Sequence, residues 1–239
     1  MSISDFHYYH YWKNPGWGTP TETLHKVRLF SGSDEFAKIP PVDGALEGIK
    51  ALRALGYRLE IVTARSTRHQ PMTEDWLSRW LPGLIDKVHY TGEFEHNPNV
   101  AIPPPPTTDS IANIKKVTKA DILVTIGARA LIDDSLPNAL LCAPVAPVLL
   151  FGDYQWNKRP STDSSAQDRM SYAERERWEG NEAKHRATQT GNKIDEADWH
   201  KWWERENLHE LPPNITRVSS WKGVIDWVNS SEGQKFVGL

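Results

Sequence analysis

The sequence predicts an α/β fold in which parallel strands form a sheet with helices on both faces. Between residues 41 and 156, segments with helical spacing of apolar residues alternate with short apolar runs typical of strands. Strand–helix–strand units in series favour a parallel sheet covered by helices on both faces. In sheets of this kind, ligands bind beyond the carboxyl ends of the strands.

The helical segments of this region carry end signals as well as periodicity. The segment at 119–126, for example, follows Thr118, a suitable N-cap, and precedes Gly127, a common terminator. The helix at 44–55 likewise ends at Gly56. The expected helices cover residues 44–55, 72–81, 119–126 and 137–142.

The strand-like runs are short and end in polar residues. The expected strands cover residues 59–62, 87–90, 130–132 and 148–151. Thr63 ends the first, and Asp133 and Asp134 follow the third, which we expect to be buried. Right-handed crossovers join a strand, a helix and the next parallel strand, yet the helix at 44–55 has no strand-like run ahead of it. The pattern therefore predicts that a strand is missing from the front of the sheet.

The remaining segments differ from this region in composition. Residues 1–40 are aromatic and turn-rich, and we interpret them as a partial cap. Residues 157–210 are polar and charged, which indicates a helical insertion outside the core. Residues 211–239 hold an amphipathic helix with Ser220 as N-cap, expected to pack on the 41–156 core. A proline-rich loop is expected around 103–106.

Composition excludes several classes of protein. The net charge of −3, with a pI near 6.3, gives no general attraction to nucleic acid or to anionic membranes. The N-terminus does not resemble a signal peptide, and the longest apolar run is too short to span a bilayer. A single cysteine, Cys142, excludes an internal disulfide and fits a reducing compartment, so we expect a cytoplasmic protein.

Three polar features are expected at the same edge of the sheet. The Thr63 hydroxyl could donate to a phosphoryl oxygen. Lys119 opens a helix, where an ammonium and free backbone N–H groups favour an anion. Asp133 and Asp134 suit the hard oxygen ligation of Mg²⁺. Each feature also has a purely structural interpretation: Thr63 as an ordinary β-branched strand residue, Lys119 as a solvated lysine, and the aspartates as a helix N-cap. Their joint placement nevertheless favours a phosphoryl-transfer site.

These residues resemble motifs of the haloacid dehalogenase (HAD)-like superfamily. Segment 61–65, Lys119 and segment 131–135 are similar to its second, third and fourth motifs. Together with the aromatic stretches 6–15 and 151–159, they resemble the 5′-nucleotidase-like branch, including its fungal-type members. The likeness spans about residues 5–159 and the final helix. It implies a three-layer Rossmann-like HAD domain with a small helical cap, of which residues 5–40 form part.

The resemblance also implies roles for individual residues. Thr63 would hold a phosphoryl oxygen, and Lys119 would offset the charge of nucleophile and phosphate. Asp133 and Asp134 would hold Mg²⁺, directly or through water. Apart from the resemblance, Arg65 and Arg68 follow Thr63 closely and are candidates for contact with the substrate, a phosphorylated small molecule; the alternative is that they are solvated loop arginines. The expected chemistry is that of a phosphohydrolase acting on phosphate monoesters, nucleotides among them.

The chain departs from the family at its first motif. That motif, Asp-x-Asp at the end of a central strand, supplies the nucleophile and the general acid/base, and no aspartate pair here matches it. We therefore expect a truncated chain that binds Mg²⁺ weakly and is inactive or impaired as a hydrolase. The alternative is a non-catalytic binding protein that uses the remaining phosphate site or the tryptophan-rich insertion.

Two aromatic features outside the sheet have alternative interpretations. Trp199, Trp202 and Trp203 are expected on one face of a helix, which either docks on the same chain or offers a site for a protein partner. His7 and His10 could suggest a metal pair, but no further ligand stands at suitable spacing, so packing or contacts of the cap with substrate are the favoured interpretations.

Overall fold

The computed structural model describes residues 2–65, 67–92, 117–159, 165–191, 193, 197–206, 208 and 210–238. The chain divides into two compact units. We call the first the aromatic unit; it consists of Met1–Arg28, Ser135–Pro137 and Asp153–Glu210. The second, called the sheet unit, consists of Leu29–Asp134, Asn138–Gly152 and Leu211–Leu239.

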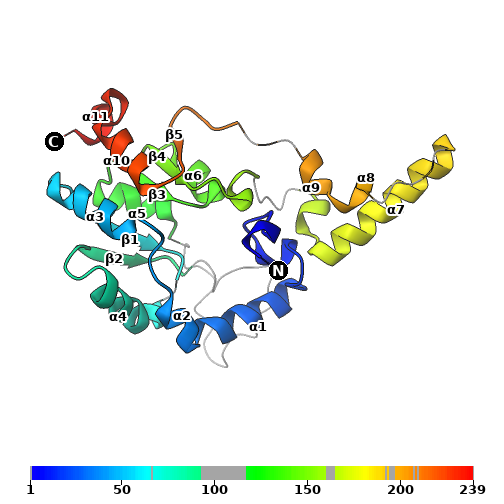
Figure 1. Cartoon of the computed structure of the whole chain (residues 1–239), viewed down its shortest axis with the longest axis horizontal. Helices are drawn as coiled ribbons and strands as arrows, with labels where there is room; N and C mark the ends of the chain where they lie inside the picture. The colour runs from blue at the N-terminus through cyan, green and yellow to red at the C-terminus, as the bar shows by residue number, and fades with distance from the viewer. Residues whose placement is uncertain are drawn as a thin grey trace, which may run out of the picture. The chain divides into compact units, whose positions relative to one another are not determined.

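The described residues of the sheet unit form five short strands, all paired in parallel (Figure 1). They are β1 (Glu60–Thr63), β2 (Lys87–Tyr90), β3 (Leu131–Asp133), β4 (Val148–Phe151) and β5 (Ile215–Val218). The predicted α/β class with parallel strands is thus confirmed. Strand β5 was not predicted; it pairs with β4 and places the C-terminal segment in the sheet.

Helices of the sheet unit precede β1, separate several of the strands and follow β5. They are α2 (Asp34–Lys38), α3 (Ala45–Ala54), α4 (Gln70–Trp80), α5 (Lys119–Ile126), α6 (Leu136–Cys142), α10 (Trp221–Asn229) and α11 (Ser231–Val237). Their ends follow the expected capping. The Thr118 hydroxyl accepts from the backbone N–H of Asp121, and Gly127 ends α5 with φ 62°. The Ser220 hydroxyl accepts from the backbone N–H of Gly223 at the start of α10.

The core of the sheet unit lies against α3, α10 and α11. A cluster of buried side chains joins these helices to the middle of the sheet: Leu52, Leu149, Val218, Val224, Trp227, Val228 and Val237. Helices α3 and α10 approach closely because Gly48 has no side chain. A Cβ at Gly48 would stand 2.5 Å from the Trp221 ring, so only glycine fits there.

The strands of the sheet unit form two separate sheets. One has the order β1-β2 and the other β3-β4-β5. Within the described residues, no strand pairs with the edge of β1 opposite β2 or with the edge of β3 opposite β4. This division is what a sheet lacking its central strand would show. A strand is found at Leu131–Asp133, close to the expected 130–132, but the expected burial is wrong for Leu131 and Ile132, which are only half-buried beside this unpaired edge.

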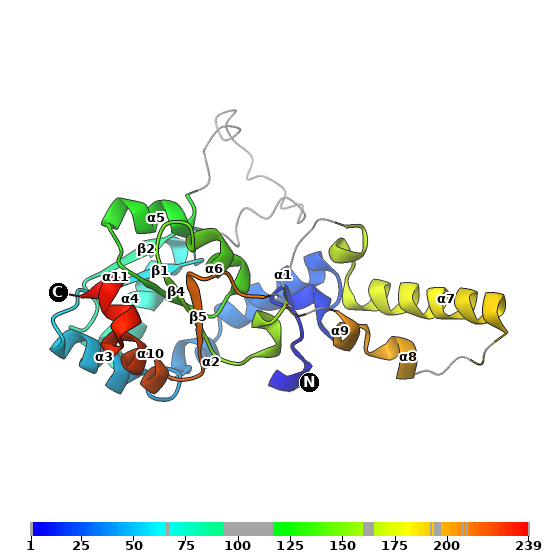
Figure 2. The ribbon, with the colours of Figure 1, turned by 90° about the horizontal axis from the view of Figure 1, so that it is seen from above.

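The aromatic unit is built from helices and aromatic contacts. Its main element is α7 (Tyr172–Thr190), with α8 (Ala197–His200) packed along it (Figure 2). Next comes α9 (Trp202–Arg205), and α1 (Pro20–Ser31) starts in this unit. The expected single helix bearing the tryptophans is interrupted at Lys201, whose φ of −116° and ψ of 50° are not helical. Short 3₁₀ turns fill the rest: Ile3–Asp5, Tyr11–Lys13, Gln155–Asn157 and Gln167–Arg169.

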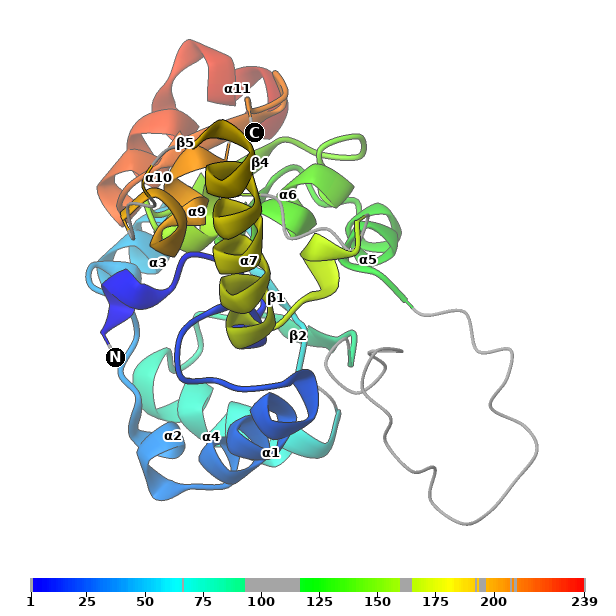
Figure 3. The ribbon, with the colours of Figure 1, turned by 90° about the vertical axis from the view of Figure 1, so that its right-hand side faces the viewer.

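Long-range contacts within this unit join its N-terminal and later segments. The Tyr8 hydroxyl donates to Glu206 at 2.8 Å, and the His7 ring stacks on Trp203 with centroids 4.1 Å apart. The 1–40 segment and the 157–210 insertion were expected as separate parts. In the structure, the first 28 residues and residues 153–210 belong to one unit, seen from the α7 side in Figure 3.

Candidate functional site

A buried ion pair lies at the carboxyl end of β3. Lys119 Nζ stands 2.5 Å from Asp133 Oδ2, and the two side chains are 10% and 4% exposed. Asp133 is the last residue of β3, and Lys119 is the first residue of α5. Two of the residues predicted from the sequence therefore meet where β3 ends and the capped helix α5 begins. A lone charge in such a place would be costly, so the two groups depend on each other.

Two further polar groups surround this pair. The amide of Asn138, on α6, donates to Asp133 Oδ1 at 3.4 Å. Cys142 is fully buried, and burial raises the pKa of its thiol to about 11, with the negative charge of Asp133 as a second cause. Sequence reasoning missed both residues as neighbours of Asp133. The available signal for Asn138 was its place in the helix that directly follows the acidic pair.

Thr63 ends β1, and within the described ranges its hydroxyl is observed only as an acceptor. The Thr63 carbonyl accepts from the backbone N–H of Thr91 at 2.9 Å, which fixes the strand end against the residue after β2. The Thr63 Oγ1 accepts from the backbone N–H of Arg65 at 3.2 Å. Since that bond uses a lone pair, the hydroxyl can still donate its proton to an oxygen of a ligand.

Arg65 forms a second polar cluster close to the end of β1. Its guanidinium lies over the ring of Phe36, 4.7 Å from the centroid, and donates to the Thr73 hydroxyl at 3.1 Å. Among the described residues, no carboxylate pairs with it, and burial lowers the pKa of Arg65. The Tyr90 hydroxyl, at the end of β2, is buried without a hydrogen-bond partner in the described structure. An anion could use both groups.

The other two candidate site residues predicted from the sequence are more exposed. Asp134 follows β3 and is exposed, and Arg68 is exposed in the 3₁₀ turn Thr67–His69. The structure thus joins Lys119 with Asp133, and it places Thr63 with Arg65. No hydrogen bond between these two groups is observed in the described part of the chain.

The carboxylates at the end of β3 fit only part of a magnesium site. Mg²⁺ takes oxygen ligands and usually keeps several waters while sharing phosphate oxygens. Both oxygens of Asp133 face donors, Lys119 and Asn138. Across the described ranges, no group of three or more His, Cys, Asp or Glu side chains is arranged to hold a metal ion. Asp133 and Asp134 therefore suit an ion that phosphate and water help to hold, rather than one held by the protein alone.

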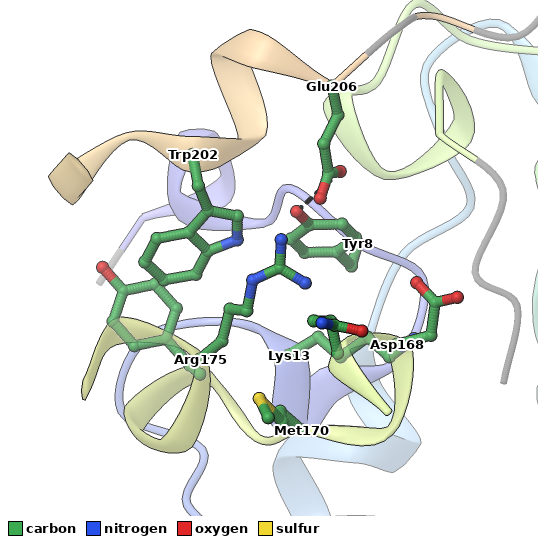
Figure 4. Close-up of a pocket in the computed structure, with 9 residues that line it drawn as sticks. Tyr8, Lys13, Asp168, Met170, Arg175, Trp202 and Glu206 are labelled. Carbon is green, nitrogen blue, oxygen red and sulfur yellow. Dashed lines mark hydrogen bonds between the residues drawn. The ribbon is translucent and has the colours of Figure 1, made fainter. Parts of the chain in front are cut away.

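The aromatic unit has a separate pocket with charges of both signs (Figure 4). The Tyr8 hydroxyl points to Glu206 there, and burial together with that carboxylate raises the pKa of Tyr8. Arg175 also lines the pocket, and it pairs with the buried Glu179, which in turn pairs with Arg205. These charges are largely matched within the unit, which indicates a structural role.

The tryptophans of this unit contact their own chain. Trp202 is buried and packs against Tyr172, and the ring of Trp203 stacks on His7. Trp199 lies 3.3 Å from the position that a Cβ on Gly180 would occupy. His7 and His10 both stack on tryptophans, the latter on Trp12, as expected for packing roles. A protein partner at Trp199, Trp202 and Trp203 stays a prediction.

The parallel strands and the polar residues at their carboxyl ends define an α/β protein with a candidate anion site. Comparisons with protein-family models, with curated proteins and with solved structures returned no match. The likeness to the HAD-like superfamily therefore stays a prediction from the motifs. No helix in the described part of the chain is both long enough and apolar enough to cross a membrane.

Proposed function

We propose that this chain binds phosphate monoesters, nucleotides among them, at a site of the HAD-like phosphohydrolase type, and that its turnover is impaired. The observation that carries the proposal is the buried pair of Lys119 and Asp133 at the carboxyl end of β3. A buried ammonium at the first residue of a capped helix is a suitable partner for an anion.

Donors suited to a phosphate stand at the carboxyl ends of β3 and β1. An ammonium has three N–H donors, and Asp133 takes one of those on Lys119. The Thr63 hydroxyl and the Arg65 guanidinium supply further donors at the end of β1. A bound Mg²⁺ held by Asp133, Asp134 and phosphate oxygens would supply charge neutralisation.

The proposed impairment follows from the lack of a suitable nucleophile among the residues that the structure describes. Phosphoryl transfer through a covalent intermediate needs a free carboxylate in line with the phosphorus, and a second group to protonate the leaving oxygen. Asp133 is a poor candidate, because Lys119 and Asn138 both hold its oxygens. Among the described residues, no carboxylate is hydrogen-bonded to the Thr63 hydroxyl.

Phosphate titration with and without Mg²⁺ tests the binding part of the proposal. Isothermal calorimetry should detect inorganic phosphate at millimolar affinity, equivalent to about 4 kcal/mol. Thr63→Val should weaken binding by about tenfold, because a hydrogen bond to a charged group is lost. Thr216→Val on β5 is the matched control and should bind as the unchanged chain does. Lack of any phosphate binding by the folded chain would refute the proposed site.

A turnover assay tests the impairment. With p-nitrophenyl phosphate and nucleoside monophosphates in the presence of Mg²⁺, we expect no hydrolysis above the background rate. Turnover that is abolished by Asp133→Ala, in a variant shown to be folded by circular dichroism, would contradict the impairment and would make the chain a working hydrolase.

A further inference from the structure

The side chain of Arg65 is fixed at two places. Its guanidinium lies over the Phe36 ring, with Cζ 4.7 Å from the ring centroid, and its Nη1 donates to the Thr73 hydroxyl at 3.1 Å. Thr73 is itself anchored, because it is only 5% exposed and its hydroxyl donates to the His69 carbonyl at 2.8 Å. Phe36 and Thr73 belong to α2 and α4, which lie side by side (Figures 1 and 3). The guanidinium is therefore held in place before any ligand binds.

This fixed guanidinium keeps a pair of unused donors. An arginine side chain carries its N–H donors in a rigid planar fork. Nη1 of Arg65 is engaged with Thr73, whereas no hydrogen bond from its Nε or Nη2 is observed within the described residues. Nε and Nη2 can together donate to two oxygens of one carboxylate or phosphate group. The side chain is thus arranged for bidentate binding of an anion.

A buried hydroxyl lies at the end of the neighbouring strand. Tyr90 is the register partner of Thr63, so the side chains of these two residues leave the β1-β2 sheet on the same face. The Tyr90 hydroxyl is buried and has no hydrogen-bond partner in the described structure. Burial lowers the pKa of Arg65, and the Tyr90 phenol opposes this shift, so the two groups lie within electrostatic reach of one another. An oxygen of a ligand would supply the partner that the hydroxyl lacks.

The charge of this cluster selects among anions. Arg65 is half-buried and contributes one positive charge, and in the described part of the chain no carboxylate pairs with it. A carboxylate brings a single negative charge, which that guanidinium balances. A phosphate monoester carries about 1.5 to 2 negative charges near pH 7, so part of its charge would stay uncompensated in a half-buried place. The cluster is therefore better matched to a carboxylate.

We propose that Arg65, Tyr90 and Phe36 form a binding site for a carboxylate group of the ligand. The carboxylate accepts from Nε and Nη2 of Arg65 and from the Tyr90 hydroxyl, while Phe36 keeps the guanidinium in position. The Thr63 hydroxyl stands close by, because its oxygen accepts from the Arg65 backbone N–H at 3.2 Å. Combined with the phosphate site of the proposed function, on which this last step rests, the ligand class becomes phosphate monoesters of small hydroxy acids.

Acetate tests the carboxylate site without any phosphate. In an isotope-labelled sample of the whole chain, nuclear magnetic resonance identifies the Arg65 Nε–H signal by its loss in Arg65→Met. We expect acetate to shift this signal saturably, and acetamide, which has a similar shape but no charge, to leave it unchanged. The Nε–H of Arg58, whose side chain is 69% exposed before the amino end of β1, should not respond. An equal response to acetamide, an equal response at Arg58, or no response at Arg65 would overturn the proposal.

A matched pair of phosphate monoesters tests the ligand class. The compounds 3-phosphoglycerate and glycerol 3-phosphate differ in that the first has a carboxylate where the second has a hydroxymethyl group. Isothermal calorimetry should show about tenfold tighter binding of 3-phosphoglycerate, which is the scale of a hydrogen bond to a charged group. This preference should disappear in Arg65→Met, decrease in Tyr90→Phe and persist in the control Arg58→Met. A preference retained in Arg65→Met would place the carboxylate elsewhere and refute the inference.

The carboxylate site and the proposed function can fail separately. Equal affinity for the two esters, with inorganic phosphate still bound, would refute the carboxylate site and leave the proposed function in place. A saturable acetate response at Arg65, with no binding of either ester or of inorganic phosphate, would refute the proposed function and leave the carboxylate site in place.

Discussion

The two sheets of the sheet unit differ in how completely they are buried. In the β3-β4-β5 sheet, the central β4 is almost fully buried, with Leu149 only 1% exposed. In the β1-β2 sheet, all four residues of β1 are only half-buried, although Ile61 and Val62 are as apolar as those of β4. The difference teaches that apolar content alone does not set how deeply a strand is buried, and that a strand neighbour on each side contributes to this burial.

The largest expected effect concerns the ion pair at the end of β3. Lys119→Met should lower the free energy of unfolding by about 3–5 kcal/mol, because it leaves the buried Asp133 carboxylate without its counter-charge. Urea unfolding followed by circular dichroism measures this loss. Replacing Asp133 with leucine in the same chain should recover most of the lost stability, since the pair is then replaced by apolar groups.

The surface pair of Lys222 and Asp226 on α10 provides the control. Its atoms are 2.6 Å apart, but Lys222 is 82% exposed. Lys222→Met should change the free energy of unfolding by only about 0.3–0.5 kcal/mol. If the two lysine variants lose similar stability, the Lys119–Asp133 pair is not buried in solution as the structure describes.

A matched pair of truncations compares the two sheets directly. Leu149→Ala on β4 should cost about 2–5 kcal/mol, because it leaves a cavity in the main core cluster. Ile61→Ala on β1 should cost about 1–2 kcal/mol, because water already reaches part of that side chain. Denaturant unfolding of both variants measures the difference. Equal costs would indicate that β1 is as fully packed as β4.

The smallest effect concerns a pair within the β1-β2 sheet. Glu60 contacts Arg58, and its Oε2 lies 2.5 Å from His89 Nε2; the hydrogen bond with His89 lowers the pKa of Glu60. A carboxyl group whose pKa is lower in the folded state adds stability above its unfolded pKa, near 4.3. This stability is lost as the pH falls through the lower folded pKa.

Glu60→Gln should therefore cost about 1 kcal/mol or less at pH 6, and its difference from the unchanged chain should shrink towards pH 3. Chemical unfolding across this pH range measures the effect. Glu47→Gln, at an exposed position on α3, should show no comparable pH dependence. A difference for Glu60→Gln that grows as the pH falls would have the wrong sign for this mechanism.

Local signals predicted much of the sheet unit. Thr118 and Gly127 bound α5, and Ser220 starts α10, because caps satisfy backbone groups that belong to the helix itself. The strand β5 was missed, since Ile215 and Val218 are its only apolar residues and its pairing partner β4 lies more than sixty positions earlier. A strand so short is recognisable only through its neighbour.

The candidate site was predicted in part for the same reason. Residues at strand ends and helix starts could be selected, because a parallel sheet brings the carboxyl ends of its strands to one edge, and Lys119 does meet Asp133. The contacts of Asn138 with Asp133 and of Arg65 with Phe36 depend on how helices pack. Local pattern contains no information about them.

The sequence alone predicted the α/β class, the parallel direction of the strands, most helix ends and the placement of Lys119 and Asp133 at the carboxyl edge of the sheet. These features depend on periodicity and on groups within a few residues of one another. Folding in three dimensions decided the division into two sheets, the half-burial of β1 and β3, and the union of residues 1–28 with 153–210. Such outcomes depend on contacts between segments far apart in the chain, as between Tyr8 and Glu206, and their energies arise only when those segments meet.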